Sequence, residues 1–169
     1  MKQILVLLCF SPIGSFSQKL IKNSTDDFTK MHVKETSWET LKSDFHRTIY
    51  FKFKKIDSTS FLYLKISFGG SVFSIEKGAD LMLKDEADSI INLQNLKYTI
   101  TSTGGGARGY LGSAGQGLEA CYPIDTYEIT ALLTKKISKI RYYMQDGYDE
   151  FEIKKSEAES LQQSLRLVQ

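Results

Sequence analysis

Hydrophobic and polar residues alternate along the middle of the chain, which is the pattern of β-strands that bury one face. In residues 49–54 (IYFKFK), Ile49, Phe51 and Phe53 alternate with one tyrosine and two lysines. Residues 62–68 (LYLKISF) repeat the same alternation. We therefore predict two strands here, with alternate side chains in a common core.

The segment between these two strands predicts how they pair. A four-residue turn at 57–60 sets Phe53 opposite Leu64, and this pairing places the apolar side chains of both strands on one face. The same register sets Lys52 opposite Lys65, which is unfavourable unless an acidic group lies nearby.

Two glycine-containing turns predict further pairing. A turn at Gly69-Gly70 suits the positive φ of a tight hairpin and pairs the preceding strand with a third strand at 73–75. Asp146-Gly147 is a strong two-residue turn signal in the last hairpin. It predicts that Tyr142 faces inward opposite Phe151.

Weaker patterns complete the set of predicted elements. Further strands are expected at 80–85 (DLMLKD), 89–94 (SIINLQ), 96–103 (LKYTITST) and 119–124 (EACYPI). Residues 126–134 predict a short helix capped by Asp125, with Glu128 three residues later. A second capping box at 156–159 (SEAE) opens a C-terminal helix. The apolar stripe of that helix consists of Ala158, Leu161, Leu165 and Val168.

Together these elements predict an α+β fold. We expect a mostly antiparallel β-sandwich or open β-barrel or roll of about eight or nine strands, with one short helix and a C-terminal amphipathic helix. The order of many strands followed by one helix resembles a pleckstrin-homology-type roll, a likeness of architecture that implies no function. Residues 35–169 are expected to form one domain, with Trp38 and Leu41 sealing an edge of its core. Residues 18–34 are expected to be an exposed polar lead-in, ordered in part.

Residues 1–17 have the order of a secretory signal. Lys2 precedes an apolar run at 4–10, and small residues flank Phe16 just before Gln18. Cleavage before Gln18 predicts an exported protein, periplasmic or extracellular. The apolar run is too short to span a membrane, and the end of this leader resembles export signals of Bacteroidota.

Cysteines and charge exclude several partners. A lipid anchor at Cys9 needs a small residue before it, and Leu8 stands there, so no anchor is expected. Cys121 remains after cleavage, so no internal disulfide can form, and its strand-like surroundings favour burial. The formal net charge is +2, with no basic stripe along the sequence, and this argues against nucleic acid as a partner.

The stretch 101–120 (TSTGGGARGYLGSAGQGLEA) holds seven glycines between Gly104 and Gly117. Its GGGARG matches the spacing of a dinucleotide-binding loop, but the later glycines interrupt the helix that must follow. We therefore expect a long connection between two strands. Where such a loop binds a protein, a glycan or a small ligand, the contacts come from its large side chains: Arg108, Tyr110 and Leu111.

Other candidate sites are weaker. His32 and His46 have no partner at metal-ligand spacing. The acidic run at 84–89 (KDEADS) lacks the order of a calcium loop, and an exposed hairpin turn is favoured. Tyr143 and Tyr148 are expected to face outward and could form a recognition surface. No catalytic residue, cofactor or metal ligand is predicted.

These observations favour an exported, non-catalytic binding module of the periplasm or cell exterior. One alternative is an exported hydrolase that uses carboxylates among its 20 acidic residues. Such an enzyme needs a concave pocket that holds acids with raised pKa values. The other alternative is a secreted inhibitor or effector that inserts its glycine-rich loop into a target.

Overall fold

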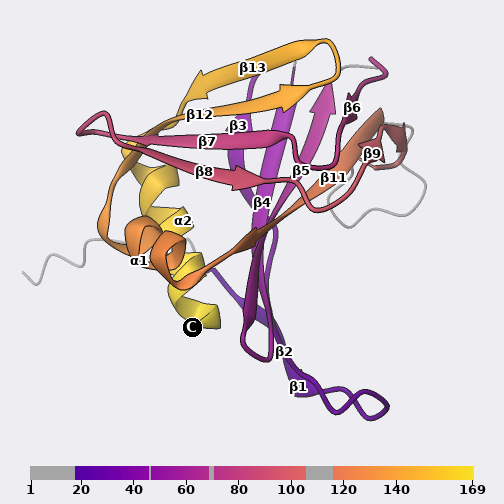
Figure 1. Ribbon diagram of the computed structural model, residues 1–169, viewed down its shortest axis with the longest axis vertical. Coiled ribbons are helices and arrows are strands. Elements are labelled where there is room, and N and C mark those ends of the chain that lie inside the picture. Colours follow the sequence, from indigo (N-terminus) through magenta and orange to yellow (C-terminus); the bar gives the residue numbers. More distant parts are fainter. Residues whose placement is uncertain (1–17, 46, 69–70, 106–115) are drawn as a thin grey trace, which may run out of the picture.

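The computed structural model of the protein describes residues 18–45, 47–68, 71–105 and 116–169. These residues form mostly antiparallel strands and two helices, which confirms an α+β fold rich in β-structure (Figure 1). The strands are β1 Leu20–Thr25, β2 His32–Thr36, β3 Glu39–Ser43, β4 Arg47–Ile56, β5 Thr59–Phe68, β6 Ser74–Ile75, β7 Asp80–Asp85, β8 Ile90–Gln94, β9 Thr99–Ile100, β10 Ser102–Thr103, β11 Gln116–Ile124, β12 Ile137–Met144 and β13 Gly147–Glu152. The helices are α1 Thr126–Thr134 and α2 Lys155–Val168.

Thirteen strands among the described residues exceed the eight or nine expected. The additional strands are β1, β2 and β3, of five or six residues, and the predicted strand at 96–103 is divided into β9 and β10. Most residues of β1, β2 and β3 are exposed or half-buried. They therefore lack the run of alternating apolar residues by which a sequence predicts a strand.

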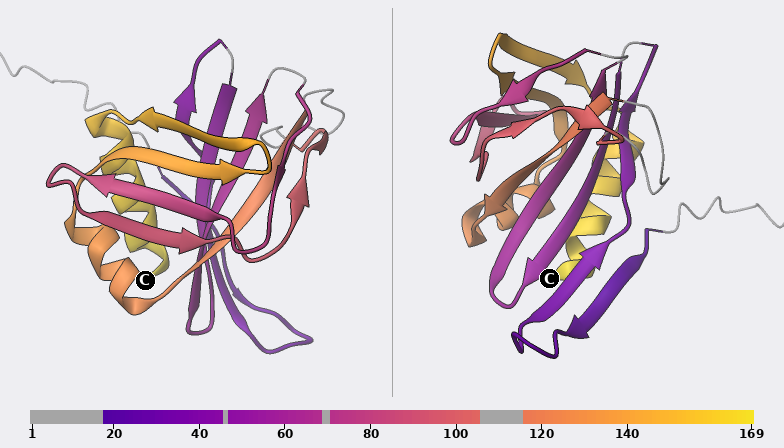
Figure 2. Two further views of the ribbon diagram at one scale, coloured as in Figure 1. Left: turned by 45° about the horizontal axis from the view of Figure 1, so that its top comes forward. Right: turned by 90° about the vertical axis from the view of Figure 1, so that its right-hand side faces the viewer.

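Two antiparallel sheets hold most of the strands. One sheet has seven strands in the order β1-β2-β4-β5-β11-β10, with β3 also pairing β4, and the other has four in the order β13-β12-β7-β8. Helices α1 and α2 lie on the same side of the long strands β4 and β5 (Figures 1 and 2). The core contains residues from both sheets and both helices. The seven-stranded sheet thus has an inner face, which the helices and the four-stranded sheet cover, and an outer face.

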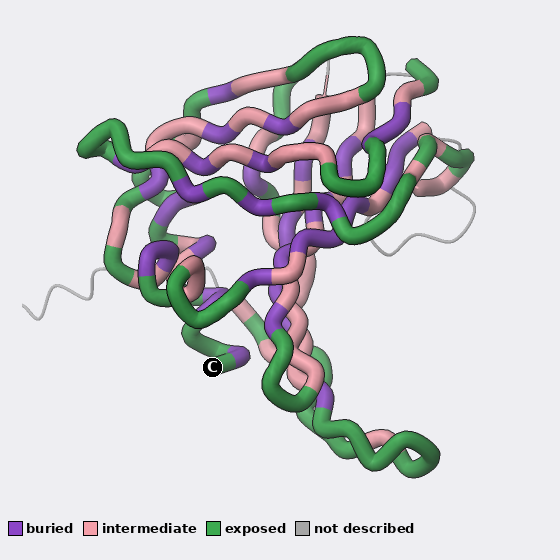
Figure 3. The backbone as a smooth tube through the Cα atoms, viewed as in Figure 1, coloured by how far each residue is buried: buried purple, intermediate pink, exposed green. Residues whose placement is uncertain are grey.

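The inner face has the composition that the alternation predicts. Buried and half-buried residues follow one another along the long strands (Figure 3). The inward side chains of β4, β5 and β11 are Ile49, Phe51, Phe53, Leu62, Leu64, Ile66, Leu118, Ala120, Tyr122 and Ile124. The predicted stripe of α2 is buried at all four positions, which confirms that this helix closes part of the core.

The pairing of β4 with β5 differs from the predicted register. Phe53 lies opposite Leu62 rather than Leu64, because the turn contains only Asp57 and Ser58. Asp57 has a positive φ of 51°, which a two-residue turn of this kind needs and which aspartate tolerates. A shift of two residues keeps the same side chains inside. It also moves Lys52 from Lys65 to Tyr63.

The last hairpin shows the same kind of shift. Its turn is Gln145-Asp146, with Met144 opposite Gly147, so Tyr142 lies opposite Asp149 instead of Phe151. Gly147 has a φ of 132°, and it forms the first position of β13 rather than part of the turn. Tyr142 faces inward and is fully buried, as predicted.

The predicted hairpin between β5 and the segment 73–75 is wrong. On the side away from β4, β5 pairs with β11 over seven residues, and β6 pairs with β9. Nine-residue β11 offers β5 a far longer ladder than the two residues of β6. Apolar pattern alone does not identify such a distant neighbour.

Several local predictions also change. The polar segment 18–34 is mostly exposed, but it forms β1 and the start of β2, because backbone pairing at a sheet edge does not require hydrophobic alternation. Helix α1 has the predicted capping box. In α2 the box begins two residues early, since Glu157 accepts a hydrogen bond from the backbone N–H of Lys154. Leu41 is buried in the core, whereas Trp38 packs on the outer face.

Asn95 joins the two sheets where the chain leaves β8. Its amide Nδ2 donates to the carbonyls of Glu76, at 3.0 Å, and of Lys97, and its Oδ1 accepts from the backbone N–H of Cys121 at 3.2 Å. The backbone N–H of Leu96 donates to the Cys121 carbonyl at 2.8 Å. One buried side chain therefore satisfies backbone groups of three segments that are distant in sequence.

Among the described residues, no helix has the length and apolar character that crossing a membrane requires.

Replacement of Asn95 by alanine should lower the free energy of unfolding by about 2–4 kcal/mol, because buried backbone groups lose their partners. Asn92→Ala is the matched control: Asn92 lies in β8, three residues before Asn95, is exposed and makes one hydrogen bond to Asp80. The control should change stability by less than about 0.5 kcal/mol. Urea unfolding at neutral pH measures both, and equal effects of the two substitutions would contradict the role given to Asn95.

Candidate functional site

The outer face of the seven-stranded sheet carries a regular arrangement of aromatic rings and amines. The register of β4 and β5 sets Tyr50 opposite Lys65, Lys52 opposite Tyr63, and Lys54 opposite Phe61. Every outward-facing cross-strand pair in this stretch thus joins one ring to one lysine. We call this surface the outer-face platform; it consists of Tyr50, Lys52, Lys54, Phe61, Tyr63 and Lys65 with Trp38, Glu35 and Glu119.

Trp38 holds two of these lysines. It lies between β2 and β3, which pair with successive parts of β4. The Lys52 and Lys65 Nζ atoms lie 4.4 and 4.6 Å from the centre of its ring. Both distances are within the range of cation–π attraction, which is worth about 0.5–2 kcal/mol per pair. The tryptophan therefore orders the two ammonium groups.

Two glutamates complete the platform. Lys52 Nζ donates to Glu35 Oε1 at 2.8 Å, and Lys54 Nζ lies 3.6 Å from the other Glu35 oxygen. Glu119 is more exposed and lies 3.9 Å from both Lys52 and Lys65. Three lysines against two glutamates leave the platform with one net positive charge.

Burial and charge shift the pKa values of the platform. Burial opposes the ionisation of Glu35, but the hydrogen bond and charge of Lys52, with Lys54, outweigh it and lower the pKa of this carboxyl. Burial lowers the pKa of Lys65, Glu119 partly offsets that effect, and the charge of Lys52 adds to it. The side chains of Lys52 and Lys65 are 12% and 13% exposed, so both amines are partly desolvated before any ligand arrives.

Cys121 lies beside Tyr63 of the platform. They lie opposite each other on β11 and β5, and Cys121 is buried, as its sequence context predicts. Burial raises the pKa of the Cys121 thiol and of the Tyr63 hydroxyl beside it. A thiol that stays protonated is a poor nucleophile, so these two side chains pack rather than react.

Among the described residues, no helix packs on this face. The end of α2 lies against the opposite face, where Gln169 Nε2 donates to Ser60 Oγ at 3.3 Å. Tyr50, Phe61 and Tyr63 are half-buried by their neighbours in the sheet. The platform is therefore a shallow surface rather than a closed pocket.

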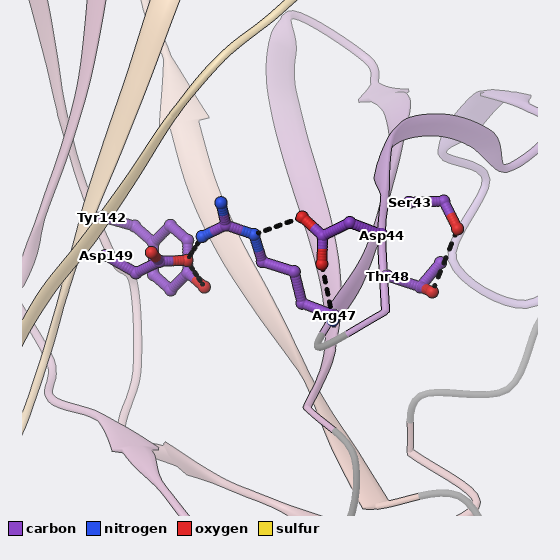
Figure 4. Close-up of polar contacts among 6 residues, drawn as sticks. All are labelled: Ser43, Asp44, Arg47, Thr48, Tyr142 and Asp149. Atoms are coloured by element: carbon purple, nitrogen blue, oxygen red, sulfur yellow. Dashed lines mark hydrogen bonds and ion pairs between the residues drawn. The ribbon is translucent and has the colours of Figure 1, made fainter.

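A second polar cluster bridges the two sheets (Figure 4). Arg47, at the start of β4, pairs with Asp149 of β13 and with Asp44, whose Oδ2 lies 3.3 Å from the Arg47 Nε. Tyr142 donates its hydroxyl to Asp149 Oδ2 at 2.8 Å. Burial lowers the pKa of Arg47, but its pairing with Asp149 and Asp44 outweighs this and raises it. One arginine against two aspartates leaves the cluster with one net negative charge, and both carboxylates pair with Arg47, so its role is to hold the sheets together.

The predicted tyrosine surface lies on the outer face of the four-stranded sheet. Tyr143 and Tyr148 are opposite each other, with ring centres 5.7 Å apart. The Arg141 guanidinium lies 4.2 Å from the centre of the Tyr148 ring and also pairs with Glu150. The structure brings the two tyrosines together, yet the nearest charges on this face are already paired.

The glycine-rich stretch is described only at its base. Ser102 and Thr103 of β10 pair with Gly117 and Gln116 of β11, so it connects two strands as predicted. Gly105 packs so closely on the Gly117 carbonyl that a Cβ there would overlap it. Several predicted features lie outside the described residues. They are the leader, His46, the turn at Gly69-Gly70, and the expected contact residues of the loop, Arg108, Tyr110 and Leu111.

The acidic run at 84–89 is the exposed turn of the β7–β8 hairpin. Asp85 Oδ1 accepts from the backbone N–H groups of Ala87 and Ser89, and its Oδ2 lies 3.2 Å from Lys135 Nζ. Across the part of the chain that the structure describes, no three His, Cys, Asp or Glu side chains are placed to hold a metal ion. The run therefore acts as a hairpin turn.

The hydrolase alternative needs acids with raised pKa values in a pocket. A pocket of about 500 Å³ beside the β7–β8 turn is lined by four acids, Asp85, Glu86, Asp88 and Glu152, and Asp85 is the buried one. Burial favours protonation of Asp85, yet backbone N–H groups and Lys135 lower its pKa. Burial raises the pKa of Glu128, but this side chain belongs to the capping box of α1. Neither carboxyl is arranged as a catalytic acid.

Sequence reasoning missed the platform although its signal is present. The outward positions of both strands hold only rings and lysines: Tyr50, Lys52 and Lys54 in one strand, and Phe61, Tyr63 and Lys65 in the other. The incorrect register placed Lys52 against Lys65, so the pattern suggested a like-charge contact. The correct pairing of rings with amines depends on the length of the turn.

No protein-family model matches this chain, and neither the curated proteins nor the solved structures include one with significant similarity to it.

Glu35→Gln should lower the free energy of unfolding by about 1 kcal/mol at pH 7. A carboxyl whose pKa is lowered on folding stabilises the fold above its ordinary pKa of 4.5, and this contribution is lost as the pH falls through the lowered value. Urea unfolding of both proteins should therefore show a difference that shrinks toward zero in acid. Exposed Glu159, 3.9 Å from Lys155, gives the control Glu159→Gln. A Glu35→Gln effect independent of pH would show that its charge is not the cause.

Proposed function

We propose that the protein is an exported, non-catalytic binding module that takes a negatively charged ligand on the outer-face platform. The observation that carries this proposal is the pair of ammonium groups, from Lys52 and Lys65, held over one indole on an open sheet face. In this proposal the two sheets form an open β-sandwich whose outer surface is the binding surface.

The platform is suited to binding because its cations are ordered in advance. A free lysine side chain loses rotamer entropy when it binds, on the order of 1 kcal/mol. Contacts with Trp38 and Glu35 already restrict Lys52. Glu119 lies 3.9 Å from both lysines, a longer contact than the 2.8 Å between Lys52 and Glu35, so an incoming anion would compete mainly with Glu119.

Two observations support export: the leader pattern in residues 1–17, and a contact between Gln18, the first residue after the predicted cleavage site, and helix α2. The Gln18 side chain donates to Ser160 Oγ of α2 at 2.9 Å. A chain cleaved before Gln18 would keep this hydrogen bond. The mature chain would then carry its ligand surface into the periplasm or the medium.

A titration that follows Trp38 emission tests the proposal directly, since Trp38 is the only tryptophan in the sequence. Dextran sulfate should change the emission at low salt, and affinity should fall as salt rises, because the attraction is electrostatic. Lys65→Gln should weaken binding about fivefold, the equivalent of roughly 1 kcal/mol. Uncharged dextran should have no effect.

Lys155→Gln supplies the matched control, because Lys155 lies on α2 and is largely exposed. It removes the same charge from the chain and should leave binding unchanged. Equal losses in Lys65→Gln and Lys155→Gln would mean that net charge, and not the platform, attracts the polymer. Full binding by Lys65→Gln would also contradict the proposed surface.

A further inference from the structure

We infer that the ligand of the outer-face platform is an acidic polysaccharide, a chain of sugar rings that carry carboxylate or sulfate groups. This inference rests on the function proposed above and adds the chemical class of the ligand. It comes from the alternation of rings and amines, which a ligand with charge alone would not need.

The alternation of rings and amines runs across the two strands, where each outward pair joins one ring to one lysine. Tyr63 is flanked by Phe61 and Lys65 along β5 and lies opposite Lys52 of β4. Side chains two residues apart on a strand are about 7 Å apart, and cross-strand neighbours are about 5 Å apart. The Phe61 and Tyr63 ring centres are 6.3 Å apart. A chain that lies across β4 and β5 therefore meets an amine beside each ring.

Sugar rings match this pattern because each has an apolar C–H face and polar edges. The C–H face can pack on an aromatic ring, and an acidic substituent at the edge can reach a neighbouring lysine. Aromatic side chains supply large contact areas with little loss of conformational entropy. The ring–amine pairs Lys54–Phe61 and Lys52–Tyr63 fit a repeating unit of this kind.

The two glutamates favour a polysaccharide over a nucleic acid. Glu35 and Glu119 lie among the lysines and reduce the platform to one net positive charge. Nucleic-acid sites neutralise one phosphate after another and are strongly basic. Both carboxylates would repel the acidic groups of either polymer, but the neutral hydroxyl groups of a polysaccharide can donate hydrogen bonds to them and offset that repulsion.

Four polymers at equal charge concentration and low salt separate the possible ligands. They are polygalacturonate, dextran sulfate, polyglutamate and oligothymidylate, each titrated into the full protein while Trp38 emission and heat of binding are followed. At least one of the two polysaccharides should bind roughly tenfold more tightly than polyglutamate and oligothymidylate. Comparison of polygalacturonate with dextran sulfate shows whether carboxylate or sulfate is preferred.

Phe61→Leu tests the contribution of the rings, because it keeps an apolar side chain and every charge. It should weaken binding of the preferred polysaccharide roughly tenfold, in line with the value of about 1–3 kcal/mol for stacking on an aromatic side chain. It should leave binding of polyglutamate unchanged. Tyr148→Leu, on the other sheet, is the matched control and should bind as the unmodified protein does. Thermal unfolding confirms that each variant is folded.

The outcomes distinguish this inference from the function on which it rests. If polyglutamate or oligothymidylate binds as tightly as both polysaccharides, and Lys65→Gln weakens that binding to the same extent, the inference of a polysaccharide ligand is wrong. The proposal of a module that binds acidic ligands then stands. Unchanged polysaccharide binding by folded Phe61→Leu also overturns the inference. No binding of any of the four polymers overturns both proposals.

Discussion

The two-residue turn at Asp57 and Ser58 sets the pairing of β4 with β5, and both faces of the seven-stranded sheet depend on this pairing. Because side chains alternate between faces, one register assigns every residue of the two strands to a side and to a partner. On the inner face it aligns Phe51 with Leu64 and Phe53 with Leu62 in the core. On the outer face the same register gives the alternation of rings and amines.

The two faces are stabilised by different forces. Burial of apolar side chains stabilises the inner face by about 1.5–3 kcal/mol for each large residue. The outer face relies on weaker contacts, such as those of Lys52 and Lys65 with Trp38. Each of these is worth about 2 kcal/mol or less. The outer face can therefore be optimised for a ligand with little effect on the core.

The sheets are joined away from the platform. Asn95 connects β8 and β11 through buried hydrogen bonds, and Arg47 connects the start of β4 to Asp149 of β13. Both connections engage fully paired polar groups, so they fix geometry without offering a site. Within the described ranges, this arrangement places both helices on one side of the long strands β4 and β5 and none on the other.

The sequence by itself determined which residues lie inside, because the alternation of Ile49, Phe51 and Phe53 has a period that only a strand with one buried face satisfies. It also determined both helices, since capping residues and apolar stripes are local signals. Only the tertiary structure decided the register of the hairpins, the neighbour of β5, and the place of Trp38. These features depend on turn length and on contacts between distant segments. A shift of two residues in the pairing of two strands changes the contacts but keeps the same side chains buried, so the sequence pattern does not reveal it. The candidate site belongs to this second group, because its chemistry arises from pairs such as Lys52 with Tyr63 across two strands.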